Sequence, residues 1–217
     1  CTVVDQEGSY NLMRIYGADP TASPPIPGMQ DGELVAFEVN GAPAVADPLV
    51  YWQDDHAAQR VDLQAGVIEG QSVLLSPEWN LVSFAVSPPV PSVGQVLTVI
   101  DGRYDRVLGE SGIHAVEIPA QYNTLQELYP GRGYYLRITN TTSLNVLIEG
   151  MPEPVTSPLS LHAGWNWVGY LPEVTLPLTE ALQSIAGAYQ RVLSIDETYD
   201  ASLPEASTLQ AMQPGQG

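Results

Sequence analysis

Trp79–Phe84 reads Trp-Asn-Leu-Val-Ser-Phe and Trp165–Tyr170 reads Trp-Asn-Trp-Val-Gly-Tyr, so one stretch of this 217-residue chain occurs twice. A second match follows in the same order, because Ile100–Leu108 returns as Ile185–Leu193 with its Tyr, Arg, Val and Leu in place. Self-similarity of this kind is typical of repeated structural units. Two shorter matches complete the set: Thr124–Gln126 with Thr208–Gln210, and Pro130–Gly133 with Pro214–Gly217.

Both occurrences predict the same order of strands and short helices. Residues 79–86 alternate as a strand does, and a helix with a capping-box spacing from Ser92 to Gln95 follows. Gly102 and Gly187 are placed to end the helices in a left-handed conformation. The apolar face of the helix has the spacing i, i+3, i+4, i+7 in each occurrence: Val93, Val96, Leu97 and Ile100, then Leu178, Ala181, Leu182 and Ile185.

The rest of the first occurrence predicts four strands and a second helix. Residues 104–108 and 113–118 are expected to pair, and Thr124 with Glu127 indicates a capped helix. Residues 134–139 and 144–149 alternate and predict a hairpin. Each module is therefore expected to be β-α-β-β-α-β-β, with module 1 at 70–155 and module 2 at 156–217. Module 2 lacks its last strands within this sequence.

Residues 1–69 predict a separate β module, partial and similar to a sandwich. Alternation over 9–16 and 33–39 indicates two strands, and 60–63 is a third candidate. Asn40-Gly41 is the strongest short hairpin signal in the chain. The expected fold class is mainly β with short helices (α+β), this module being followed by the two similar ones.

The composition excludes several functions. The net charge is −18, and Lys is absent, so all seven basic residues are Arg. Such a balance repels nucleic acid and anionic membrane surfaces. No run is apolar enough for membrane insertion. The one cysteine, Cys1, cannot form an internal disulfide. It is a candidate for a disulfide to an upstream partner, or for lipid attachment in a mature lipoprotein.

Three motifs resemble tandem Gly-Trp-Asn-type repeats of bacterial secreted and surface proteins. They are Gly164-Trp165-Asn166, Tyr104 with Val107, and Pro130–Tyr135 (Pro-Gly-Arg-Gly-Tyr-Tyr), while Glu78 stands where the pattern has Gly. Residues 17–20 and 37–41 are similar to Ig-like or carboxypeptidase-regulatory-like modules. The resemblance covers most of the chain and implies an extracellular or cell-surface accessory role. It transfers no catalytic residue.

Few residues are candidates for binding. Trp79, Trp165 and Trp167 are expected to be core residues, because they occupy matching strand positions. Trp52 beside Tyr51 is the better candidate for an exposed ligand contact. The remaining candidates are Asp19 and Asp31 for calcium, which is the one candidate cofactor, and Asn140 in the sequon Asn140-Thr141-Thr142 for glycosylation.

Nucleophile, phosphate-loop and paired-carboxylate motifs are absent from the sequence, so we expect no enzymatic activity. The expected function is an acidic structural or adhesive module of a bacterial surface or secreted protein, self-assembling by strand addition. Its expected partners are copies of itself, other surface proteins or polysaccharide. The alternative is a carbohydrate-binding accessory region of a secreted hydrolase.

Overall fold

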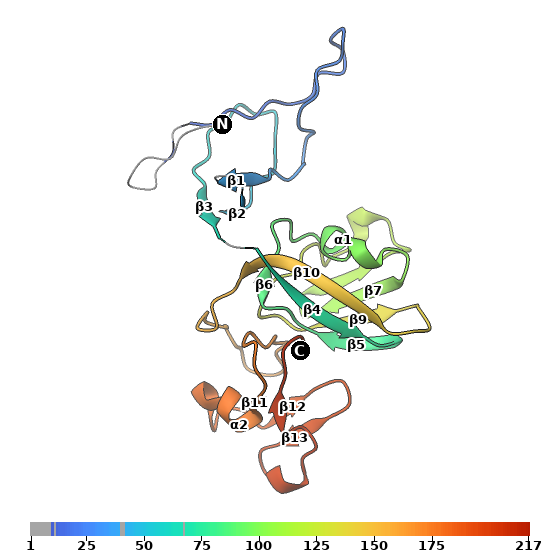
Figure 1. Ribbon diagram of the computed structural model, residues 1–217, viewed down its shortest axis with the longest axis vertical. Helices are drawn as coiled ribbons and strands as arrows, with labels where there is room; N and C mark the ends of the chain where they lie inside the picture. The colour runs from blue at the N-terminus through green and yellow to red at the C-terminus, as the bar shows by residue number, and fades with distance from the viewer. Residues whose placement is uncertain (1–9, 11, 40–41, 67) are drawn as a thin grey trace. The chain divides into compact units, whose positions relative to one another are not determined.

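The computed structural model describes residues 10, 12–39, 42–66 and 68–217 (Figure 1). The chain divides into two compact units, residues 1–65 and residues 66–217. Strands make up 35% and helices 10% of the structure, which confirms a mainly β fold with short helices. Among the described residues, no helix has both the length and the apolar character needed to cross a membrane.

The described part of the first unit forms one antiparallel sheet in the order β1-β2-β3. Its strands are β1 (Phe37–Val39), β2 (Ala42–Asp47) and β3 (Asp62–Ala65). Val39 lies opposite Ala42, and Asn40-Gly41, the predicted hairpin signal, lies outside the described residues. The strand predicted over 9–16 is wrong in its described part, since residues 12–16 have no regular structure. In the loop that follows, isolated β-bridges join Gly17 to Met29 and Asp19 to Ile26.

The second unit contains two sheets that enclose its main core, and we call this pair of sheets the sandwich. One sheet has the order β4-β10-β6 and the other β5-β9-β7-β8. Buried side chains from both sheets, together with those of α1 and η1, form one cluster. The elements are β4 (Glu69–Leu75), β5 (Glu78–Val82), β6 (Val86–Ser87), α1 (Val93–Val96), η1 (Thr98–Ile100), β7 (Tyr104–Gly109), β8 (Gly112–Ala115), η2 (Ala120–Tyr122), β9 (Tyr134–Ile138) and β10 (Leu144–Pro152).

The hairpin predicted from 134–139 and 144–149 is wrong in its pairing. Both strands exist, but β9 pairs with β5 and β7, whereas β10 pairs with β4 and β6. The chain between them therefore crosses from one sheet to the other. The pairing of β7 with β8 is as predicted.

The helices are shorter than predicted. Helix α1 gives way to the 3₁₀ turn η1, and the Ser92 side chain makes no capping hydrogen bond. No helix forms around Thr124, because its hydroxyl accepts the backbone N–H of Ile113 at 3.0 Å and fixes the segment against β8. Gly102 and Gly187 adopt the predicted left-handed conformation, with φ of 72° and 78°.

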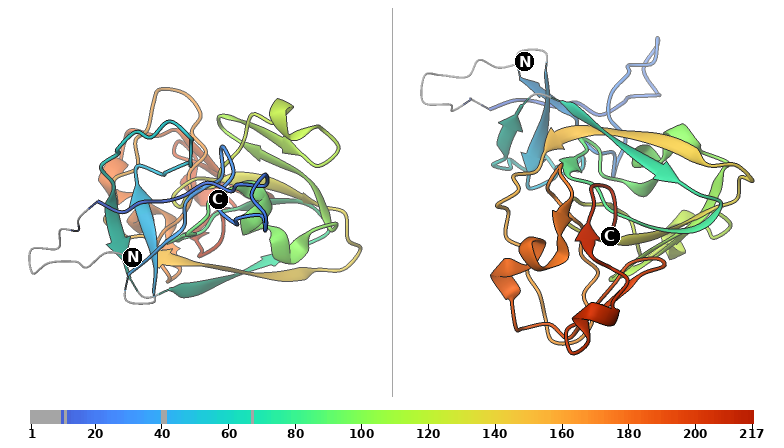
Figure 2. Two further views of the ribbon diagram at one scale, coloured as in Figure 1. Left: turned by 90° about the horizontal axis from the view of Figure 1, so that it is seen from above. Right: turned by 60° about the horizontal axis from the view of Figure 1, so that its bottom comes forward.

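Residues 156–217 form smaller sheets beside the sandwich (Figures 1 and 2). We call residues 70–155 the first segment and residues 156–217 the second segment. The second has a small core of its own around Leu178, Tyr199 and Leu209. Its elements are β11 (Leu176–Pro177), α2 (Leu178–Ala181), η3 (Gln183–Ile185), β12 (Arg191–Leu193), β13 (Thr198–Asp200), η4 (Pro204–Ala206) and β14 (Ala211–Met212).

The two segments make matching hydrogen bonds. The Asn80 Oδ1 accepts the Ser76 N–H and the Asn166 Oδ1 accepts the His162 N–H, both at 2.8 Å. Glu78, where the sequence pattern has Gly, adopts a positive φ of 68°, as Gly164 does with 100°. Three further hydrogen bonds of the first segment also have a match in the second. The bond from Val93 N to Gln126 O matches that from Leu178 N to Gln210 O, and the bond from Arg103 N to Ile100 O matches that from Ala188 N to Ile185 O. The bond from Ile113 N to Thr124 Oγ1 matches that from Thr198 N to Thr208 Oγ1.

Candidate functional site

The two segments meet through a reciprocal exchange of backbone contacts. The Gly169 N–H donates to Gly131 O at 3.0 Å, and the Ser83 N–H donates to Gly215 O, also at 3.0 Å. Isolated bridges join Val168 to Arg132 and Val82 to Gln216. Each segment's Trp-Asn strand is thus joined to the Pro-Gly-x-Gly turn of the other. We call this set of contacts the exchange junction.

Ser83 lies at the centre of the exchange junction. Its side chain is fully buried, with an exposed fraction of 0%. The Ser83 hydroxyl donates to Gln216 O at 2.6 Å and accepts the Tyr170 N–H at 3.2 Å. Gly169 matches it in sequence, and a Cβ there would come within 2.8 Å of both Ser83 Cβ and Arg132 O. The junction therefore has room for one side chain, and only one of the two segments carries it.

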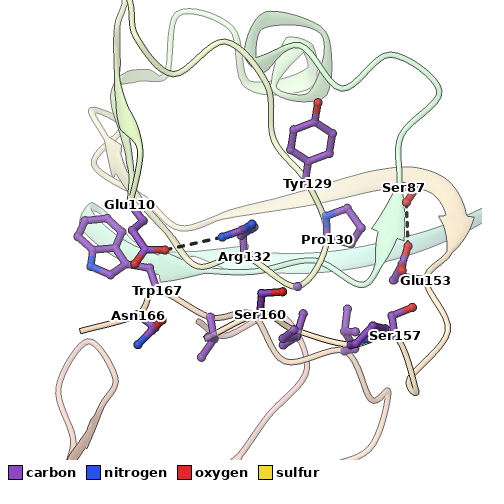
Figure 3. A pocket seen from close by; sticks show the side chains of 15 residues that line it. Ser87, Glu110, Tyr129, Pro130, Arg132, Glu153, Ser157, Ser160, Asn166 and Trp167 are labelled. Atoms are coloured by element: carbon purple, nitrogen blue, oxygen red, sulfur yellow. Dashed lines mark hydrogen bonds and ion pairs between the residues drawn. The ribbon is translucent and has the colours of Figure 1, made fainter. Parts of the chain in front are cut away.

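A cleft of about 360 Å³ lies within the second unit, next to the exchange junction (Figure 3). Strand ends and loops of both segments line it, since the turn after Tyr129 supplies one side and residues 157–160 and 166–168 supply another. Ser87 and Glu153 lie at one end, with 3.2 Å between the hydroxyl and a carboxylate oxygen.

Charged residues gather at the other end of the cleft. Glu110 lies 3.7 Å from the Arg132 guanidinium, and its second carboxylate oxygen lies 2.7 Å from the His162 imidazole. The hydrogen bond from His162 to Ala163 O raises the pKa of the imidazole above its ordinary value, and the Glu110 carboxylate adds to this effect. Protonation of His162 therefore strengthens this ionic group.

The Trp167 ring stands beside this charged group in the cleft (Figure 3). Its centroid is 5.2 Å from that of Tyr135 in an edge-on arrangement, so a neighbouring strand holds the indole in place. A planar ring with a carboxylate and a guanidinium around one cleft can contact the faces and hydroxyls of a sugar.

Trp52 and Tyr51, the predicted ligand contacts, belong to the first unit and do not line this cleft. Tyr51 is exposed and bridges Leu34. Trp52 is partly buried, and its indole N–H donates to Ile15 O at 3.3 Å. Its ring packs against Gly17, where a Cβ would come within 2.3 Å. Trp52 therefore has a packing role in the structure, and ligand contact stays a prediction.

The calcium and modification candidates are not brought together in one site. The Asp19 carboxylate accepts hydrogen bonds from the Thr21 hydroxyl at 2.7 Å and from the Thr21 N–H at 2.9 Å. These bonds close a local turn and lower the pKa of Asp19. The described residues contain no group of three or more His, Cys, Asp or Glu placed to hold a metal ion, and calcium binding at Asp19 and Asp31 stays a prediction. Asn140 donates to Thr142 O at 3.0 Å in the β9–β10 connection. Cys1 lies outside the described residues.

The expectation that the strand tryptophans are buried is wrong for Trp165. Trp165 is 60% exposed, whereas Trp79 is partly covered by the Tyr135 ring and by Arg137 at 5.7 Å. Both covering residues belong to β9, which has no counterpart in the second segment. The two tryptophans therefore differ because their neighbours differ.

Sequence reasoning missed both the exchange junction and the charged group of the cleft. The Ser83 to Gly169 difference was visible in the aligned repeats, but only the three-dimensional contacts explain it. Glu110 and His162 belong to no motif, and Arg132 lies at the variable position of the Pro-Gly-x-Gly turn.

Comparison with known proteins gives no match, whether against protein-family models, curated proteins or solved structures. The resemblance to Gly-Trp-Asn-type repeats therefore stays a prediction.

Proposed function

We propose that this chain is a non-enzymatic structural or adhesive part of a bacterial secreted or surface protein. In this proposal the first and second segments are copies of one module, and the exchange junction locks them into a rigid pair. The observation that carries the proposal is the reciprocal contact of Ser83 with Gly215 and of Gly169 with Gly131. The hydrogen bonds within the first segment that recur at matching positions within the second support the common origin of the modules.

A locked pair suits a load-bearing or spacing role. Each segment's turn is held by the other segment's strand, so neither segment can separate without breaking contacts at two places. The abundance of acidic residues favours solubility and suits a protein outside the cell. The second segment has a small core, so the contacts with the sandwich contribute much of its stability.

Hydrogen exchange under native conditions tests the locking. Amides of 81–84 and 167–170 are expected to open with the same free energy, because each opening disrupts the same junction. The amides of β8 are the control for the sandwich alone. Opening of 167–170 at a much lower free energy than 81–84 would show that the segments move independently, and would contradict the proposal.

Carbohydrate binding is the second candidate function, and the cleft of Figure 3 favours it. Trp167, Arg132 and Glu110 offer a ring and hydrogen-bonding groups in one concave place. Titration of the chain with bacterial polysaccharide fragments, followed by intrinsic fluorescence, tests this candidate. Binding that Arg132→Gln weakens and Arg14→Gln leaves unchanged would support it. The absence of saturable binding by any fragment would refute it.

A further inference from the structure

The two ends of the cleft in Figure 3 differ in charge. At one end the Glu110 carboxylate is paired with protein groups, since it lies 3.7 Å from the Arg132 guanidinium and 2.7 Å from the His162 imidazole. At the other end the Glu153 carboxylate accepts a hydrogen bond from the Ser87 hydroxyl at 3.2 Å. Among the described residues, no Arg or His forms an ion pair with Glu153. One end of the cleft thus carries a carboxylate without a cationic partner.

The fold holds Glu153 firmly at its end of the cleft. It follows the last residue of β10, and its N–H donates to Ala85 O at 2.7 Å. Its side chain is partly buried and lies at the end opposite to Glu110 (Figure 3). Salt screens a partly buried charge less than an exposed one, and such a charge is stabilised by a partner of opposite sign. This end of the cleft therefore favours a ligand that brings a cation.

The rest of the cleft suits a hydroxylated ring. The Trp167 indole offers an aromatic face, and Ser157 and Ser160 place hydroxyls along the wall between the two ends (Figure 3). An aromatic face packs against the C–H groups of a sugar ring, and a hydroxyl can both donate to and accept from a sugar hydroxyl. The cleft of about 360 Å³ is near the lower limit for small-molecule sites, so it fits a short segment of a saccharide.

The charge of the whole chain acts in the same direction. A net charge of −18 repels acidic polysaccharides and attracts cationic ones. We propose that the cleft binds an oligosaccharide with a free amino group, its ammonium at Glu153 and one of its rings against Trp167. This inference rests on the carbohydrate-binding candidate above and names the class of sugar. An ammonium donates three hydrogen bonds, so it can bond the Glu153 carboxylate and hydroxyls nearby at the same time.

Two saccharides of equal length that differ in charge alone at the amine test the proposal: a short glucosamine oligomer and its fully N-acetylated form. Each is titrated into the full chain at physiological ionic strength and a pH of about 6, where amines are protonated and carboxylates are ionised. We expect the amino form to bind at least about tenfold more tightly, as one charge-assisted hydrogen bond implies. In NMR spectra the amides of 157–160 and the Trp167 indole N–H should shift, whereas the Trp52 indole N–H, outside the cleft, should not.

A pair of charge-matched variants locates the ammonium. Glu153→Gln keeps the size of the side chain and can still accept the Ser87 hydroxyl, but it should reduce the preference for the amino form to less than about twofold. Glu205→Gln removes the same charge from an exposed position on η4, outside the cleft, and should leave the preference unchanged. An unchanged preference in Glu153→Gln would overturn the placement of the ammonium.

The remaining outcomes separate this inference from the functions proposed above. Equal affinity for the two saccharides would overturn the inference and leave carbohydrate binding as a candidate. Saturable binding by neither would overturn the inference together with that candidate, while the exchange junction is still judged by hydrogen exchange. Equally tight binding of a short lysine peptide would show that the cleft selects charge alone, and would overturn the assignment to a saccharide.

Discussion

Replacement of Ser83 by Ala removes the one side chain at the centre of the exchange junction. Two backbone groups lose their partner, because the hydroxyl donates to Gln216 O at 2.6 Å and accepts the Tyr170 N–H at 3.2 Å. Ser83 is fully buried, so water cannot readily replace the hydroxyl. An orphaned buried donor or acceptor costs about 1–3 kcal/mol, so Ser83→Ala should lower the free energy of unfolding by about 2–4 kcal/mol.

Urea unfolding at neutral pH, followed by tryptophan fluorescence and circular dichroism together, measures this loss. The control is Ser72→Ala, since Ser72 is exposed and its hydroxyl bonds the exposed Asn145 at 2.6 Å. The control should change the free energy of unfolding by less than about 0.5 kcal/mol. A loss for Ser83→Ala no larger than that of the control would refute the assignment of Ser83 as a buried link between the segments.

Two further predictions concern backbone strain and protonation. Glu78→Gly should stabilise the chain by about 0.5–1 kcal/mol in the same urea assay, because Glu78 holds a left-handed φ of 68° that favours Gly. Gly164→Ala should destabilise the chain, because Gly164 has a φ of 100°. Destabilisation by Glu78→Gly or stabilisation by Gly164→Ala would contradict the account. The His162 pKa should lie above the ordinary value of an imidazole in an NMR titration, and Glu110→Gln should lower it. Because the folded-state pKa of His162 is raised, the contribution of this contact to stability is complete below the unfolded-state pKa. That contribution is lost as pH rises through the folded-state pKa. An unchanged His162 pKa in Glu110→Gln would show that Glu110 does not raise the His162 pKa.

The local elements were predictable where periodicity and turn residues agree. The strands at 104–109 and 134–138 and the left-handed Gly102 all follow from alternation or from glycine at the end of a helical pattern. Thr124 shows how such local reasoning fails. Its spacing to Glu127 satisfies a capping box, but its hydroxyl instead bonds the Ile113 N–H in the neighbouring strand. A tertiary contact therefore decides what that side chain does.

Pairing and site geometry were not predictable from the sequence. The alternation of 134–139 and 144–149 is the same whether the strands pair with each other or belong to facing sheets, and the structure has the second arrangement. Trp165 was misassigned for a related reason, since burial depends on the strand beside it and not on its own pattern. Glu110, which lines the cleft, and His162 meet only because the two segments pack together.

Exchange of the two central residues tests the reciprocal junction most directly. Gly169→Ser alone should be strongly destabilising, because its Cβ would approach Ser83 Cβ and Arg132 O within 2.8 Å. In the double variant Ser83→Gly with Gly169→Ser, the close approach to Ser83 Cβ is removed, while the approach to Arg132 O remains. The account predicts that the double variant is more stable than the sum of the single changes by at least about 1 kcal/mol in urea unfolding. Additive losses would contradict a junction in which the two segments take equivalent places.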